Sequence, residues 1–234
     1  MKRFYTTVST SSDNIGWAVL LDDKPVKTPL GKQLRAPTEG IANLMVQEWS
    51  AQEDEIEPES MPITQIITTA IDRVTAERDE IERQTLAYID TDMICYRAQQ
   101  PESYVKRQAD AWDKWVEWYN QQSGDVLLTT TALSALKQPN MCRDHAVKCV
   151  KSMDLWHFTV FQILVSITGS FILSLAFMDK YFDEEELFQL SHVEDLLRSE
   201  IYNEDFYGIA PTQERKWNVT KRDFKAIQSI LGAL

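Results

Sequence analysis

Glycine, histidine and cysteine are all scarce in this sequence. Its 234 residues include only seven glycines, three histidines and three cysteines. Few glycines leave little material for a phosphate-binding loop, and few histidines leave little for general-base catalysis. The sequence also contains no nucleophile elbow and no His-Glu-x-x-His zinc motif. We therefore predict that the protein is not an enzyme.

The cysteines exclude a disulfide framework, because three thiols are too few and odd in number. Cys142, His145 and Cys149 stand at positions i, i+3 and i+7 of one predicted helical face. Thiolate and imidazole both bind zinc, but structural zinc sites need four ligands, and no fourth one is evident. We predict neither a metal site nor a cofactor.

Basic residues are outnumbered by acidic ones, which gives a net charge of −12 and a pI of about 4.7. This balance argues against nucleic acid or an anionic membrane surface as the main partner. The first nine residues also lack the apolar stretch of a signal peptide. We expect a bacterial cytoplasmic protein, or a mitochondrial matrix protein from which a presequence has been removed.

The chain changes character along its length. Residues 4–36 contain three short β-prone runs separated by turn-forming residues, which is typical of a small antiparallel sheet. The rest is dominated by helical patterns, including Trp112, Trp115 and Trp118 at helical spacing. We predict an α+β protein, with a β-rich N-terminal domain and joint helices in residues 1–75 and a helical bundle in residues 76–234.

The stretch from residue 44 to residue 74 predicts the joint between these parts. Its first half is expected to be a helix over residues 39–53, with Trp49 on the apolar face and Glu48 beside it. An acidic segment follows, then Ser60 as a predicted N-cap, and then a second helix with a continuous apolar face. Glu48 and Trp49 are either a client-contacting or joint-locking pair, or an anchor tryptophan with a carboxylate at its rim.

Residues 155–178 contain no aspartate, glutamate, lysine or arginine, a length that could span a bilayer. Several polar side chains and a central glycine weaken that interpretation, and lysines flank both ends. We expect one or two helices, broken near residues 168–170 and buried all round in the bundle. The alternative is a membrane-associated adaptor anchored through residues 155–178.

Two separated motifs resemble one known family. The segment EWSAQ at residues 48–52, followed by MPITQIITTAIDRV at residues 61–74, is similar to the ATP12 family of assembly chaperones for the F1 part of ATP synthase. The Lys27-Thr28-Pro29 turn, the YIDTDMICYRA segment and the ITGSFILSLAF segment also resemble family patterns. The resemblance extends from Phe4 to about Asp205.

The resemblance implies the function and the partner. It implies a chaperone that binds the free F1 α subunit and prevents its aggregation until it assembles with β, without membrane insertion and without consuming ATP. We expect the chain to act as a monomer. The partner-binding candidates are Glu48, Trp49, Asp92, Glu194 and Asp195.

Three of these candidates lie in the C-terminal part of the chain. Asp92 is predicted to share a helical face with Tyr88 and Cys95, as a buried structural acid or as a contact point. Glu194 and Asp195 match the start of the family's acidic C-terminal motif, which continues here as Arg198 and then residues 202–205. The family's Gln, Trp and Gly are not found at these positions. A small-molecule enzyme that uses this acidic helix would require converging carboxylates.

Overall fold

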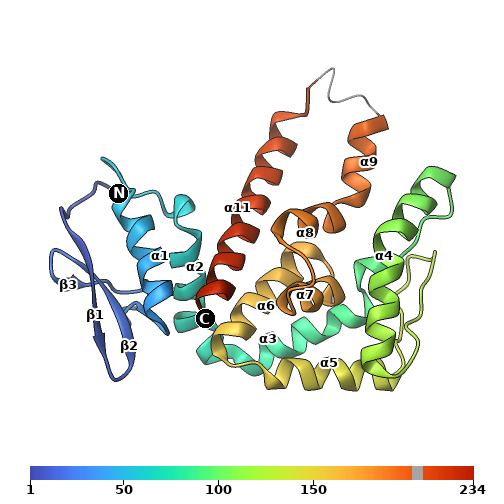
Figure 1. The fold of residues 1–234 in the computed structure, drawn as a ribbon, viewed down its shortest axis with the longest axis horizontal. Coiled ribbons are helices and arrows are strands. Elements are labelled where there is room, and N and C mark those ends of the chain that lie inside the picture. Colours follow the sequence, from blue (N-terminus) through green and yellow to red (C-terminus); the bar gives the residue numbers. More distant parts are fainter. Residues whose placement is uncertain (202–207) are drawn as a thin grey trace. The chain divides into compact units, whose positions relative to one another are not determined.

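The fold is known from a computed structural model, which describes residues 1–201 and 208–234. A small antiparallel sheet is followed by helices, so the α+β prediction is confirmed (Figure 1). The strands are β1 (Val8–Asp13), β2 (Gly16–Leu21), β3 (Lys24–Pro25) and β4 (Arg35–Ala36). The helices are α1 (Glu39–Ser50), α2 (Pro62–Thr69), α3 (Thr75–Ala87), α4 (Glu102–Ser123), α5 (Asn140–Ser152), α6 (Leu155–Thr168), α7 (Phe171–Met178), α8 (Glu184–Ser191), α9 (Val193–Ile201) and α11 (Pro211–Ala233).

The residues group into two compact units. The first comprises residues 1–79, 154–160 and 225–234, and the second comprises the described parts of 80–153 and 161–224. We describe each unit by itself. Whether residues 1–75 and 76–234 fold as separate domains is a different question, and that division stays a prediction.

In the first unit, β2 is the central strand of the sheet. It pairs antiparallel with β1 along its whole length, from Val8 opposite Leu21 to Asp13 opposite Gly16. β3 and β4 pair with different parts of its other edge. Val19 and Leu21 are buried, since β2 is the most apolar of the predicted strands.

Helix α1 packs on this sheet, and α2 packs on α1. Thr38 caps the N-terminus of α1 by accepting a hydrogen bond from the Ile41 N–H. The predicted apolar face of the second helix is confirmed, with Ile63, Ile66 and Ile67 buried. Ser60 as the N-cap was wrong, because Ser60 ends a short 3-10 turn and Met61 occupies the N-cap position.

The sequence pattern of residues 75–99 is typical of one long helix, but the structure has a shorter one. α3 stops at Ala87, and two short 3-10 turns follow at residues 88–90 and 93–95. Asp92 has a non-helical backbone, with a φ of −59° and a ψ of 124°, and accepts a hydrogen bond from the N–H of Ile94, a local bond that competes with helix formation. The prediction of one helical face shared by Tyr88, Asp92 and Cys95 is therefore wrong.

The uncharged stretch forms two helices, α6 and α7, which meet at the predicted break. Gly169 lies there with a φ of +68°, a left-handed conformation that favours glycine. α7 is buried on every side from Phe171 to Phe177, whereas α6 exposes Ser166, so complete burial was right for α7 alone. None of the helices in residues 1–201 and 208–234 combines the length and apolar character needed to cross a membrane.

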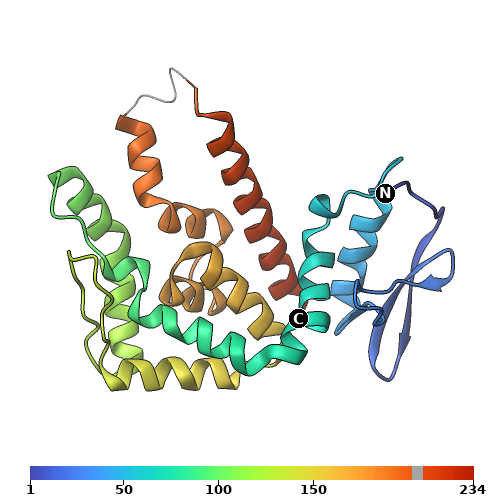
Figure 2. The same cartoon turned by 180° about the vertical axis from the view of Figure 1, so that it is seen from behind.

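The long helix α4 carries the three tryptophans at helical spacing, of which Trp112 and Trp115 are buried in the core and Trp118 is half-buried. A loop of residues 125–138 then runs along α4, although the second half of this segment has a helix-like sequence before Pro139 (Figure 1, Figure 2). Pro139 instead precedes α5 at its N-cap position, where a proline costs little. The last helix, α11, begins at Pro211.

Gly169 provides a test of the break between α6 and α7. We expect Gly169→Ala to lower the free energy of unfolding by about 1–2 kcal/mol, because alanine is strained at positive φ. Gly232→Ala is the matched control, since this glycine lies in α11 and a Cβ there would meet nothing within 4 Å. Urea denaturation measures both, and equal stability of the two variants would contradict the assignment.

Candidate functional site

Glu48 lies in α1 and holds the start of α2. Its Oε1 accepts a hydrogen bond from the Ile63 N–H at 2.7 Å, and its Oε2 accepts one from the Thr64 N–H at 2.8 Å. These are among the first N–H groups of α2, which have no partner within the helix. A carboxylate at a helix N-terminus also interacts favourably with the helix dipole. Glu48 therefore supplies the cap that Ser60 was predicted to supply.

Trp49 anchors the same helix to the N-terminal segment. Its side chain is 8% exposed and packs edge-to-face against the ring of Tyr5, with ring centroids 5.9 Å apart. The Tyr5 hydroxyl donates to the Trp49 backbone carbonyl at 2.7 Å. The buried indole N–H of Trp49 finds no acceptor in the described part of the chain. Of the two alternatives given above, this geometry fits an anchor tryptophan.

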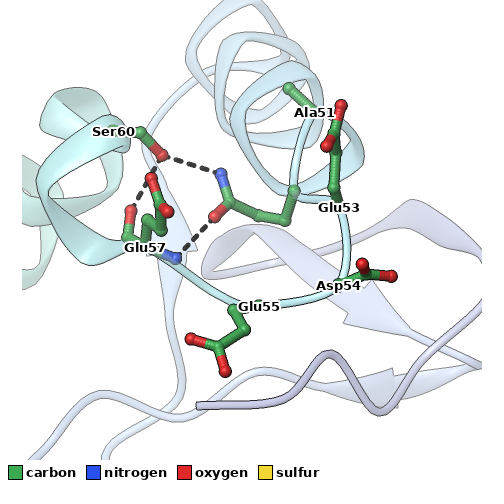
Figure 3. A pocket seen from close by; sticks show the side chains of 7 residues that line it. Ala51, Glu53, Asp54, Glu55, Glu57 and Ser60 are labelled. Atoms are coloured by element: carbon green, nitrogen blue, oxygen red, sulfur yellow. Dashed lines mark hydrogen bonds between the residues drawn. The ribbon is translucent and has the colours of Figure 1, made fainter.

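Gln52, the last residue of the EWSAQ motif, fastens the acidic segment after α1. Its amide oxygen accepts from the Glu57 N–H, and its amide nitrogen donates to the Ser60 hydroxyl. Beside it is an open hollow of about 400 Å³, lined by residues 51–55, Glu57 and Ser60 (Figure 3). The carboxylates of Glu53, Asp54 and Glu55 point in different directions there. They do not converge on one point.

Asp72 makes a link that the sequence did not predict. It lies in a π-helical turn, Ala70–Val74, which follows α2 directly. Its Oδ1 accepts from the Thr28 hydroxyl at 2.7 Å, and its Oδ2 accepts from the Leu30 N–H at 3.1 Å. Two family-like segments far apart in the sequence are thus joined by one carboxylate. Their similarity to the same family was the only available signal for this contact.

In the second unit, Asp92 is completely buried. Its Oδ2 accepts from the Ile172 N–H at 2.9 Å, at the start of α7, and its Oδ1 accepts from the Ile94 N–H at 3.2 Å. The adjacent Met93 N–H donates to the Gly169 carbonyl at 3.0 Å. Burial raises the pKa of Asp92 to about 6, although the surrounding N–H groups and Ser170 oppose that shift. Of the two predicted alternatives, this is the geometry of the buried structural acid.

Glu194, at the start of α9, is exposed and is held by α4. Its Oε1 accepts from the Gln108 amide nitrogen at 2.6 Å, and the buried Gln108 in turn accepts from the Ala98 N–H. Asp195 turns instead to Arg198 on its own helix, with 3.6 Å between the charged atoms. These two carboxylates do not converge, so they do not form the pair that the enzyme alternative requires. The predicted motif residues 202–205 lie outside the described residues.

The histidine and cysteine pattern does not form a metal site. The His145 Nε2 and the Cys149 Sγ are 3.4 Å apart, but the Cys142 Sγ lies beside the Ser123 hydroxyl. Burial raises the pKa of the Cys149 thiol and lowers that of His145, so both groups are neutral near pH 7. Over residues 1–201 and 208–234, no group of three potential ligands could hold a metal ion.

The structure thus separates the five candidates. Glu48 and Trp49 belong to the first unit, and Asp92, Glu194 and Asp195 belong to the second. Within the second unit, Glu194 and the two neighbours of Asp92, namely Thr91 and Met93, line one hollow. Sequence reasoning missed Gln52, Asp72 and Gln108, the polar residues that fix the candidates or the segments beside them.

The cap formed by Glu48 leads to a first test. We expect Glu48→Ala to lower the free energy of unfolding by about 1–2 kcal/mol, because two N–H groups of α2 lose their acceptor. The control is Glu53→Ala, an exposed residue of the same segment, expected within about 0.5 kcal/mol of the parent chain. Urea denaturation gives both values, and an unchanged midpoint for Glu48→Ala would disprove the cap.

The buried Asp92 leads to a second test, on pH. A raised folded-state pKa stabilises the fold below the unfolded pKa, and that contribution is lost as the pH rises through about 6. Between pH 5 and 7.5, above the pI, we expect a loss of roughly 1–1.5 kcal/mol from this residue. The Asp92→Asn variant has no carboxyl group at this position, so its free energy of unfolding should lack this pH-dependent loss. The control variant Asp79→Asn, at an exposed position, should show the same pH-dependent loss as the parent chain.

The experiment is chemical denaturation of the three chains at several pH values within that window. A steeper fall with pH in the parent chain than in Asp92→Asn is the expected result. Equal slopes in these two chains would show that Asp92 does not titrate differently in the folded state.

Comparison with known proteins identifies relatives of the whole fold. The crystal structure of Atp12 from Paracoccus denitrificans matches with a TM-score of 0.87 and 28% identity, over 99% of this chain and 97% of that one. A protein of Agrobacterium tumefaciens described as a candidate chaperone matches with a TM-score of 0.88 and 29% identity, over 99% of this chain and 85% of that one.

Sequence comparison agrees with the structural comparison. The mitochondrial protein atp12 of Schizosaccharomyces pombe is 25% identical over 205 residues, which cover 82% of this chain and 70% of that protein. The family model described as ATP12 chaperone protein matches residues 2–120, just over half of the chain. The chain therefore belongs to the ATP12 family, the assembly chaperones of the F1 part of ATP synthase.

Proposed function

We propose that this chain binds the free α subunit of F1 and keeps it from aggregating until the β subunit takes its place. Family membership is the observation that carries this proposal. A subunit separated from its ring exposes an interface that is normally buried, and such surfaces aggregate. A holder with a net charge of −12 keeps the complex soluble through charge repulsion.

The five candidate residues take different roles in this proposal. Glu194 is exposed and Asp195 is partly exposed, so both can contact a basic group of the client directly. Glu48, Trp49 and Asp92 are positioning residues, because their polar groups or rings are engaged within the chain. We treat the two units separately and assign direct contacts to the second.

The chain is further proposed to act as a monomer, without a cofactor and without catalysing a reaction. For its location we propose the bacterial cytoplasm, or the mitochondrial matrix if a presequence is removed. The relatives support either choice, since one is a mitochondrial protein and two come from bacteria. Since α subunits differ between organisms, the client should come from the same organism as the chain.

The test is protection of purified α subunit from aggregation. Diluted from denaturant or warmed, the α subunit should scatter less light when an equimolar amount of the chain is present, and a complex of the two should elute together in gel filtration. Serum albumin at the same concentration is the control. Unchanged scattering and separate elution would reject the proposal.

A further inference from the structure

The loop of residues 125–138 exposes apolar side chains. Leu133 is fully exposed, Val126 is 65% exposed and Leu128 is 46% exposed. The only charged residues of the loop are Asp125 and Lys137, near its two ends. Exposed aliphatic side chains in an uncharged segment often mark a binding surface.

This loop is held in place by hydrogen bonds at several points. The amide group of the buried Gln138 donates to the Leu128 carbonyl and accepts from the Leu128 N–H. The Tyr96 hydroxyl accepts from the Leu136 N–H at 3.2 Å, and the Cys95 carbonyl accepts from the Thr130 N–H at 2.8 Å. Because its backbone is fixed in advance, the loop would lose little entropy when a partner binds.

Next to the loop is an open hollow of about 460 Å³, which we call the Leu133 surface. It is lined by Thr91, Met93, Tyr96, Leu133, Ala135 and Glu194. Its walls come from the loop, from the turn around Asp92 and from α9. Its volume lies within the range of about 300–1,000 Å³ that is usual for ligand pockets in proteins.

Among the described residues, the lining of the Leu133 surface carries one charge, which is negative. Within that part of the chain, Glu194 is the only ionisable lining residue apart from the Tyr96 phenol. Gln108 holds one of its oxygens, and within the described chain nothing donates to the other, Oε2. A carboxylate with a free oxygen beside apolar walls is complementary to a lysine or arginine flanked by apolar side chains.

From this juxtaposition we infer that the Leu133 surface is the docking site for an apolar segment of the client that carries a basic residue. The aliphatic part of the segment contacts Leu133, Met93 and Tyr96, and its lysine or arginine pairs with Glu194. This inference rests on the proposed function, and it adds the surface and the chemistry of the segment. Asp92 supports the surface indirectly, since it fixes the turn that carries Thr91 and Met93.

Two substitutions test the surface with purified F1 α subunit as the probe. Leu133→Asp should weaken binding of the α subunit at least about tenfold, because it places a charge where the leucine side chain would be buried in the complex. Leu30→Asp is the matched control, an exposed leucine of the first unit, and should bind like the parent chain. Glu194→Lys should weaken binding similarly, and Glu102→Lys, at another exposed acid of the second unit, should not.

A photo-crosslinking amino acid at position 133 gives a direct readout. It should link to the α subunit at a peptide that contains apolar residues and a lysine or arginine, whereas the same amino acid at position 30 should not link. Circular dichroism and the melting temperature confirm folding, which substitutions at these exposed positions should leave unchanged.

The outcomes separate the two proposals. If the parent chain protects the α subunit and Leu133→Asp protects equally well, the docking site is rejected and the proposed function stands. If the parent chain neither protects nor crosslinks, the proposed function fails, and the docking site fails with it.

Discussion

The buried carboxylate of Asp92 is the interaction on which the second unit depends most. One side chain accepts hydrogen bonds from the first turn of α7 and from the short turn at residues 93–95. Removing a carboxylate from water is costly, so its place in the core is possible only because several donors surround it. The same interaction fixes where α7 begins and where Met93 lies, so it connects the core to the surface.

In the first unit, too, carboxylates accept hydrogen bonds from backbone N–H groups of other segments. Glu48 holds the start of α2 as Asp92 holds the start of α7, and Asp72 ties the turn after α2 to the loop that contains Thr28. In all three cases a carboxylate satisfies backbone N–H groups of a distant segment. The family-like motifs of this chain are thus largely explained by the internal contacts of their acids. Under the proposed function, Glu194 and Asp195 of the acidic C-terminal motif are the exception, because they are exposed or partly exposed and can contact a client.

Sequence patterns predicted the elements better than their connections. Apolar periodicity predicted the buried face of α2, and the small residues near Gly169 predicted the break between α6 and α7. Local patterns could not show that Glu48, and not Ser60, caps α2, because the acceptor lies in another helix. The same holds for the bonds of Asp72 to Thr28 and of Gln108 to Glu194. The sequence of residues 125–138 fits a turn and an extended piece that lead into a helix, but no helix forms there, because the loop is held by its own Gln138 side chain and by the distant Tyr96 hydroxyl.

A turn fixed by Asp92 and a loop fixed by Gln138 together form one acidic and apolar surface, which we propose binds the unassembled subunit. Hydrogen exchange with mass spectrometry tests this most directly, on the chain alone and mixed with purified F1 α subunit. We expect slower exchange on binding in residues 91–96 and 130–136. Protection confined to other segments, with these two unchanged in a complex that does form, would contradict the proposal.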